Sequence, residues 1–436
     1  MQTKLNLIAK MAVEDKKCQF KTLAYLLNAE GLKESFYKLK KGKATGVDEI
    51  DEKDYEDNLE TNLQNLVERM KKQAYKPQPV KRVYIPKANG KMRPLGIPAI
   101  EDKMVQMGIT RILEAIYEAD FLDCSFGFRP GRGCHDALDK IDKLIMTKPV
   151  NHIIDSDIKG FFDNVDHEWM VKFLEVRVKD ENLLRIIRRF LRAGYMEEGK
   201  KHLTEKGTPQ GGVISPILAN IYLHYVLDEW IELKVKKESR GVVEMVRYAD
   251  DFVVCVQYKD EAEKILTILK ERLQKFGLEL AEDKTRIVEF GRFAEENARG
   301  KGRRPDTFNF LGFTHFNDRT RKGGFKVGRK TDRRKLNTKL KEMNQWMKKI
   351  RNQIAVKEWW KILCAKLRGH INYFGVSGNF RSIKKYYVEV CKLVFKWVNR
   401  RSQKKTLNST KFFEYIERYK LPKPRIVHNF YTLYSY

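Results

Sequence analysis

The chain has 436 residues, of which 42% are hydrophobic, and a formal net charge of +29 at pH 7. This length and apolar content predict about two or three folded domains and exclude a wholly disordered chain. No apolar run approaches the roughly 20 residues that span a bilayer, the N-terminus lacks the order of a secretory signal, and none of the six cysteines forms a CxxC pair. We therefore expect a soluble cytoplasmic protein without membrane segments, disulfides or a zinc site.

The N-terminal part of the chain predicts helices followed by a hairpin. Residues 1–75 carry leucines at helical spacing. Prolines in the next segment exclude a helix interior, so VKRVYIP at 80–86 is expected to form a strand and KANGK at 87–91 a turn. A further helix is predicted over 100–120.

The middle of the chain alternates strands with helices, which predicts an α+β fold. A glycine-rich loop leads into a helix from His135, and HIIDSDI predicts a strand over 152–158. The loop GTPQGGVISP then opens a long apolar helix. The remaining predicted elements are a helix over 161–176, two strands around a tight turn over 242–256, a helix over about 260–276 and further strands up to 316.

The positive charge is concentrated at the C-terminal end. Residues 321–436 contain 31 Lys and Arg against 6 Asp and Glu, a net charge of +25, while the first 320 residues hold the remaining +4. The pattern after residue 321 is helical, and aromatic residues at spacings near three and four indicate a core beneath a basic surface. Nucleic acid is the expected partner, because each neutralised phosphate releases a counterion and solubility alone needs far less asymmetry.

Two adjacent acids, Asp250 and Asp251, lie between the apolar runs VVEMV and FVVCV. Carboxylates this close repel each other unless a cation lies beside them, and a divalent metal ion supplies that cation. The alternative is a polar hairpin turn, in which Asp is common for conformational reasons. From these four residues alone, Tyr248 to Asp251, both interpretations stay open.

A third acid, Asp157, ends the predicted strand 152–158 and precedes a helix. A strand end beside a central hairpin would place it near Asp250. Three such carboxylates hold two Mg²⁺ ions in enzymes of phosphoryl transfer, with Mn²⁺ as an alternative ion. Taken alone, Asp157 is better explained as a helix N-cap or a surface acid. Three further acids, Asp155, Asp163 and Asp166, are interpreted as structural or supporting.

Ordered motifs across nearly the whole chain resemble those of reverse transcriptases, most closely the bacterial group II intron-encoded reverse transcriptases called maturases. The motifs are KATGVD (43–48), IPKANGKMRPLGIP (85–98), FGFRPGRGCHDAL (126–138), DIKGFFD (157–163), TPQGGVISP (208–216), YADD (248–251), FLGF (310–313), KLRGHINYF (366–374) and WVNRRSQ (397–403).

This resemblance implies a right-hand polymerase with fingers, a palm built on an antiparallel sheet and a helical thumb. Asp157, Asp250 and Asp251 match the family's catalytic, metal-binding acids. Phe162 matches the family's steric gate. A rigid aromatic ring at that place, beneath the incoming sugar, leaves no room for a 2′-hydroxyl. Phe161 is adjacent, and at least one of the two phenylalanines is expected to belong to the core.

Other positions match residues that contact the incoming dNTP. Gln210 and Gly211 match the nucleotide-binding TPQGG loop, and Lys87 and Arg93 match finger residues that clamp the triphosphate. Lys91 is an alternative to Lys87.

Two further matches to family positions lie near the end of the predicted palm. Lys284 matches a lysine suggested to protonate the departing pyrophosphate, although surface lysines are common in this chain. Phe310, Leu311 and Gly312 match a turn that grips the primer strand, with a plain core role as the alternative.

The resemblance divides the chain into an N-terminal extension and start of the fingers (1–75), fingers and palm (76–320) and a basic thumb/maturase domain (321–436). It implies an RNA template, a DNA primer, dNTPs and an intron RNA as partners, and a role in intron splicing and mobility. The dispersed acids after residue 321 offer no nuclease-type metal site. We therefore expect the short class that lacks an endonuclease domain.

Three other functions share part of these features. A reverse transcriptase from a defence or CRISPR-linked system would have the palm but not the tail motifs. A non-catalytic RNA-binding splicing factor would have lost acids that are intact here. An RNA-dependent RNA polymerase is disfavoured by Phe162.

Overall fold

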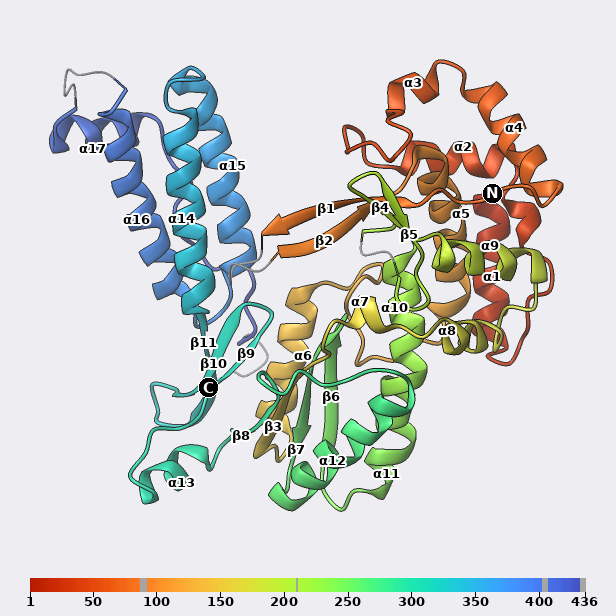
Figure 1. The fold of residues 1–436 in the computed structure, drawn as a ribbon. Coiled ribbons are helices and arrows are strands. Elements are labelled where there is room, and N and C mark those ends of the chain that lie inside the picture. Colours follow the sequence, from red (N-terminus) through yellow and green to blue (C-terminus); the bar gives the residue numbers. More distant parts are fainter. Residues whose placement is uncertain (87–91, 209–210, 402–406, 432–436) are drawn as a thin grey trace. The chain divides into compact units, whose positions relative to one another are not determined.

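The structure is a computed structural model, and it is described over residues 1–86, 92–208, 211–401 and 407–431 (Figure 1). The chain forms two compact units, each built from two stretches of sequence. The first unit comprises Met1–Ala137 and Ile154–Ile287, and the second comprises Leu138–Ile153 and Val288–Tyr436.

Helices make up much of the first unit. Side-chain caps fix where several helices begin: Asn28 accepts a hydrogen bond from Gly31 N, and Asp180 accepts from the amides of Asn182 and Leu183. The helices are α1 (Gln2–Glu14), η1 (Ala24–Leu26), α2 (Ala29–Lys38), α3 (Glu52–Glu56), α4 (Leu59–Lys71), α5 (Ile100–Tyr117), α6 (Cys134–Thr147, which continues into the second unit), α7 (Phe161–Asn164), α8 (His167–Leu174), α9 (Glu181–Arg192), α10 (Ser215–Leu223), η2 (His224–Asp228), η3 (Ile231–Val235), α11 (Lys236–Glu238) and α12 (Lys259–Lys275).

Two four-stranded sheets belong to this part of the chain. One has the order β2-β1-β4-β5, in which β1 pairs antiparallel with β2 and parallel with β4; the other has the order β6-β7-β3-β8. The strands are β1 (Val80–Pro86), β2 (Met92–Ile97), β3 (His152–Asp157), β4 (Tyr195–Glu197), β5 (Lys200–His202), β6 (Val243–Tyr248), β7 (Asp251–Val256) and β8 (Arg286–Glu289). The α+β class is confirmed, and so is the tight hairpin, because Tyr248 pairs with Asp251.

Two of the predicted elements of this unit take a different form. The helix expected over 161–176 is two helices, because the Asp166 carboxylate accepts a hydrogen bond from Trp169 N and starts α8 anew. The long apolar helix after residue 215 is present, but η2 and η3 within it are π-helical turns. Such turns are rare and often lie at functional sites.

The second unit joins a three-stranded antiparallel sheet to basic helices. The sheet has the order β11-β10-β9, and α14, α15 and α16 lie side by side (Figure 1). The prediction of helix directly after residue 321 was wrong, because β11 pairs with β10 along its whole length. The elements are α13 (Ala294–Gly300), β9 (Phe308–Phe310), β10 (Phe313–Arg319), β11 (Phe325–Thr331), α14 (Arg333–Ile350), α15 (Val356–Phe374), α16 (Phe380–Val398) and α17 (Ser409–Arg418).

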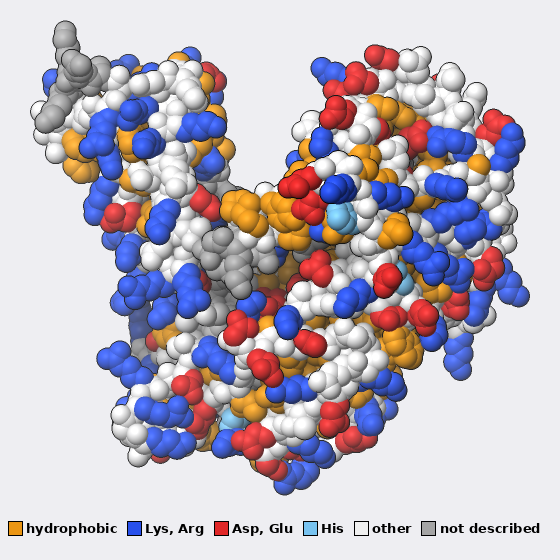
Figure 2. Space-filling model, viewed as in Figure 1, with side chains coloured by type: hydrophobic (Ala, Val, Ile, Leu, Met, Phe, Trp, Pro, Cys, Tyr) orange, Lys and Arg blue, Asp and Glu red, His pale blue; other side chains and the backbone are white. Residues whose placement is uncertain are grey.

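The aromatic residues of these helices form their core, as the spacing predicted. Trp359, Trp360, Tyr386 and Trp397 are buried together with Leu and Val side chains of α14–α16 and with Phe412 of α17. Lys and Arg side chains consequently spread over the outer surface of the same helices (Figure 2). None of the described helices is both long and apolar enough to cross a membrane.

The second unit contains a fully buried ion pair between Arg329 and Asp142. We expect Asp142→Ala to lower the free energy of unfolding of this unit by about 3–5 kcal/mol, because it leaves the Arg329 charge buried without a partner. Urea denaturation followed by circular dichroism measures the loss. Glu389→Ala, which breaks the solvent-exposed pair with Lys392, is the control and should have little effect. A loss no larger than that of the control would contradict the importance of the buried pair.

Burial lowers the pKa of His224, in η2, to about 4. A histidine whose pKa is lower in the folded chain than in the unfolded one stabilises the fold above pH 6.5, and this stability is lost as the pH falls towards 4. The difference in unfolding free energy between the wild type and His224→Gln should shrink by roughly 2 kcal/mol from pH 7 to pH 4.5. Denaturant titrations at both pH values check this, and parallel pH profiles would rule it out.

Candidate polymerase site

Three carboxylates gather at one end of the sheet β6-β7-β3-β8. Asp157 ends β3, Asp251 begins β7, and Asp250 lies in the turn between β6 and β7. Burial raises the pKa of Asp250, and the charge of nearby Asp157 raises it further, while Arg93 and Lys284 lower it. The structure therefore brings together the acids that the sequence placed almost a hundred residues apart.

A cation already faces this group of acids. Lys284 Nζ forms an ion pair with Asp157 Oδ2, and the loop that carries it is tied to β3 by a hydrogen bond of 2.8 Å from Ala281 N to Asp157 O. The hydrogen bond to Asp157 raises the pKa of Lys284, with smaller contributions from the charges of Asp283 and Asp251. In this arrangement Lys284 is a firmly protonated counter-charge to the acids.

Within the described residues, no three His, Cys, Asp or Glu side chains are arranged, as they stand, to hold a metal ion. At this site, Lys284 pairs with Asp157. The donor set nevertheless suits a hard divalent cation, since carboxylate oxygens are the ligands that Mg²⁺ prefers, and Lys284 marks where positive charge is accommodated. Asp157, Asp250 and Asp251 would hold such ions once Lys284 releases Asp157.

The predicted steric-gate position differs clearly from its neighbour. Phe161 is buried and packs edge-to-face on Tyr222, whereas Phe162 is only half-buried. The loop that precedes TPQGG is tied to this segment: Thr208 N donates to Phe162 O at 2.7 Å, and Gly207 N donates to Val165 O at 2.7 Å. Of the two phenylalanines, Phe161 therefore belongs to the core and Phe162 is the one available to a ligand.

The same loop reaches the β1–β2 hairpin. Gly211 has φ of 109°, and a Cβ there would lie 2.6 Å from Leu95 Cδ1 and 2.7 Å from Gly96 O, so only glycine fits this close approach. Arg93, exposed on β2, acts electrostatically on Asp250. The predicted nucleotide contacts Lys87 and Gln210, and the alternative Lys91, lie outside the described residues.

The proposed primer-gripping residues lie in the second unit and form a two-residue hairpin turn. Phe310 pairs with Phe313, and both intervening residues have positive φ, 49° at Leu311 and 86° at Gly312, as a type I′ turn requires. Tyr373 Oη donates to Leu311 O at 2.9 Å. The rings of Phe310 and Phe313 are buried, so the part of this turn available to a ligand is its backbone.

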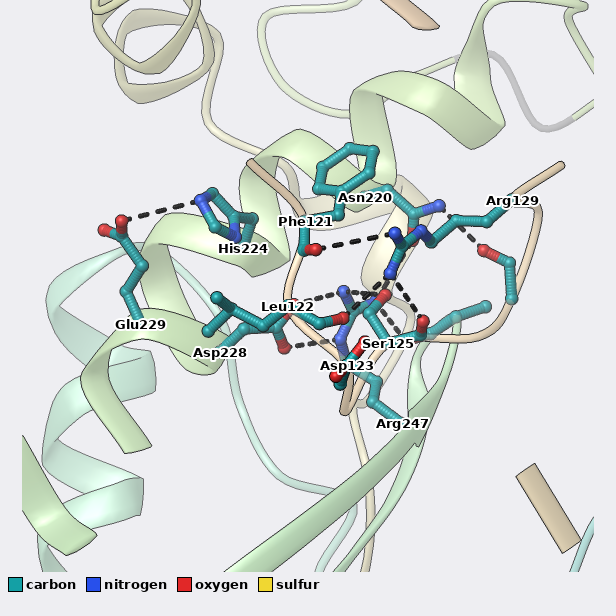
Figure 3. Close-up of polar contacts among 12 residues, drawn as sticks. Phe121, Leu122, Asp123, Ser125, Arg129, Asn220, His224, Asp228, Glu229 and Arg247 are labelled. Carbon is teal, nitrogen blue, oxygen red and sulfur yellow. Dashed lines mark hydrogen bonds and ion pairs between the residues drawn. The ribbon is translucent and has the colours of Figure 1, made fainter. Parts of the chain in front are cut away.

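The sequence interpretation missed the buried contacts that support the turn carrying Asp250. Arg247 is fully buried, ion-paired with Asp228 and hydrogen-bonded to Asn220 (Figure 3). The available signal was a basic residue, Arg247, in the largely apolar segment VVEMVRY and an acidic residue, Asp228, in the largely apolar segment ILANIYLHYVLD. Charged residues are almost never fully buried unless they are paired, so these opposite charges were candidate partners, with Glu244 in the first segment as a second charge to place.

Comparison with known proteins assigns the family. Residues 85–315 match the family of reverse transcriptases (RNA-dependent DNA polymerases). The group II intron-encoded protein LtrA of Lactococcus lactis subsp. cremoris is 31% identical over 74% of this chain and 65% of its own length. Protein YkfC of Escherichia coli (strain K12) is 33% identical over 65% of this chain and 78% of its own length.

A solved telomerase from Candida albicans aligns at a TM-score of 0.45 and 13% identity, covering 79% of this chain and 63% of the telomerase chain. That likeness is too distant to bear on function. The chain spans 65% of the length of the group II intron-encoded relative, slightly under two thirds. Because the family match covers more than half of the chain and includes Asp157, Asp250 and Asp251, the chain belongs to the reverse transcriptases.

Proposed function

We propose that this protein is an RNA-directed DNA polymerase that extends a DNA primer on an RNA template with dNTPs. The observation that carries the proposal is the gathering of Asp157, Asp250 and Asp251 at one sheet end, beside the cations Arg93 and Lys284. Anionic groups that need divalent ions and cationic groups that attract a triphosphate thus occur side by side.

The chemistry divides between the bound ions and the chain. Asp157, Asp250 and Asp251 would hold two Mg²⁺ ions, which would supply activation of the primer 3′-hydroxyl and neutralisation of the charge that develops on the triphosphate. Arg93, on the β1–β2 hairpin, contributes a planar cation that grips phosphate oxygens in two places. The close contact between Gly211 and β2 couples that hairpin to the nucleotide-binding loop.

Discrimination between sugars is assigned to Phe162. The ring is half-buried, and its edge-to-face contact with Phe161, with centroids 5.3 Å apart, fixes its orientation. A rigid ring under the sugar accepts hydrogen at the 2′ position and clashes with a hydroxyl. The protein is therefore proposed to use dNTPs rather than NTPs.

The basic helices of the second unit are proposed to bind RNA, including the intron RNA whose splicing and mobility the protein would support. Their aromatic residues form the core, so the Lys and Arg side chains are free to follow phosphate backbones. Relatives named for intron-encoded and maturase proteins support this role. They favour it over a defence-linked enzyme without a splicing role.

Asp250→Asn should abolish primer extension on an RNA template with Mg²⁺ and dNTPs, because it removes one negative charge where the ions bind. Binding and splicing of intron RNA should persist, since the basic helices are unchanged. Gel-based extension and splicing assays on the same preparation measure both activities. Full extension by this variant would refute the site, and a wild type that splices but never extends a primer would identify a non-catalytic splicing factor.

Phe162→Val should raise NTP incorporation relative to dNTP incorporation by about 10-fold or more, because it opens space for the 2′-hydroxyl. The ratio of kcat/KM for the two nucleotides on one template measures this. The matched control is Phe161→Val, which makes the same substitution at the buried neighbouring residue. It should lower the stability of the protein without changing the ratio of NTP to dNTP incorporation. An unchanged ratio in Phe162→Val would remove this residue from sugar selection.

A further inference from the structure

Arg247 is the last charged residue before the catalytic turn, and it uses its whole hydrogen-bonding capacity. A guanidinium has five N–H donors. Here Nε donates to Asp228 Oδ1 (2.7 Å), Nη1 to Asn220 Oδ1 and Ala249 O (both 3.1 Å), and Nη2 to Ser125 Oγ (2.7 Å) and Asp228 Oδ2 (2.5 Å) (Figure 3). The side chains of Arg247 and Asp228 are both fully buried.

One of these bonds reaches the turn that carries the catalytic acid. Ala249 has φ of 59°, a left-handed conformation that costs free energy for a residue other than glycine and persists only where surrounding contacts enforce it. Its carbonyl is the one that Arg247 holds. Because the peptide bond is planar and trans, a fixed Ala249 carbonyl points the Asp250 N–H the opposite way, where it donates to the Asp250 carboxylate.

A second set of contacts holds the turn at Ala249. Asn220 Nδ2 donates to Gly127 O at 2.7 Å, and Gly127 lies so close to the turn that a Cβ there would be 2.4 Å from Ala249 N. Phe126 N also donates to Arg247 O at 2.9 Å. The turn is therefore held by the guanidinium on one side and by the backbone of Gly127 on another.

The π-helical turn η2 brings the two helical partners of Arg247 into line. Asn220 and Asp228 are eight positions apart, and in a regular α-helix they would point about 80° away from each other. One extra residue in a π turn makes them equivalent to positions seven apart, a difference of about 20°. Both side chains then face one guanidinium, as Figure 3 shows.

We propose that Arg247 is a positioning residue for metal binding: anchored by Asp228 and Asn220 on the π-bulged helix, it holds the Ala249 carbonyl and so fixes the orientation of the Asp250 carboxylate. This inference rests on the proposed function, because it assigns a cause to the geometry of the same three acids. It requires no direct contact of Arg247 with metal, nucleotide or primer.

The test begins with the metal-free protein, where polymerase activity plays no part. Arg247→Lys keeps the charge but offers three donors in place of five. Hydrogen–deuterium exchange of the amides of residues 248–252 should become about 10-fold faster in this variant, and the Mg²⁺ concentration for half-maximal primer extension should rise by about 10-fold, as for other residues that orient metal ligands. The dNTP KM at saturating Mg²⁺ should change little.

The matched control is Arg177→Lys. Arg177 is another buried arginine of the same unit, ion-paired with Asp120 and bonded to the backbone at Cys18, and it has no contact with the turn among the described residues. A comparable loss of thermal stability with unchanged exchange at 248–252 and unchanged Mg²⁺ dependence is expected for it.

Asn220→Ala is the second test variant if Arg247→Lys does not fold. It removes the Asn220 acceptor of Arg247 Nη1 and keeps the ion pair between Arg247 and Asp228. Faster turn exchange and a higher Mg²⁺ requirement in either variant, beyond the Arg177→Lys control, support the proposal. Values equal to the control in every variant that folds overturn it. Failure of the proposed function would look different: the wild-type protein would show no extension at any Mg²⁺ concentration, while the exchange comparison would still be readable.

Discussion

Repulsion among Asp157, Asp250 and Asp251 is the constraint on which the rest of this site depends. Three like charges at one end of a sheet are unfavourable unless cations lie beside them, and burial of Asp250 makes this worse, as the raised pKa of its carboxyl reflects. The chain meets the constraint in two ways. It places Lys284 against Asp157, and Arg247 donates a hydrogen bond to the Ala249 carbonyl in the turn that carries Asp250.

Much of this arrangement could be predicted from the sequence because local patterns determine it. Two apolar runs around Ala249 and Asp250 leave few alternatives to a tight hairpin, and aromatic residues at helical spacing in a basic tail must be buried somewhere. The α+β class followed from such patterns, whereas the assignment of Asp157, Asp250 and Asp251 as metal-binding acids came from the family resemblance and stays a prediction. Phe161 and Phe162 are the limiting case, since the sequence indicated that one was core but only the structure distinguished them.

What could not be predicted involves contacts between distant residues or hydrogen bonds that leave no period in the sequence. α7 ends at Asn164, and Asp166 starts α8 by accepting a hydrogen bond from Trp169 N, a contact that the apolar spacing does not reveal. The strand over 325–331 exists because β10 offers it a partner. The π turn at 224–228 follows i to i+5 bonding, which the apolar pattern of a 3.6-residue repeat does not reveal.

In the π-bulged helix, the stability of the helix by itself and the alignment of its polar side chains favour different backbone bonding. Regular α-helical bonding of the same residues would leave a helix that is intrinsically more favourable by itself. It would also turn Asp228 about 80° away from Asn220 around the helix axis, and the buried Arg247 guanidinium would lose its carboxylate partner. The less regular helix is thus the one in which Asn220 and Asp228 both reach Arg247.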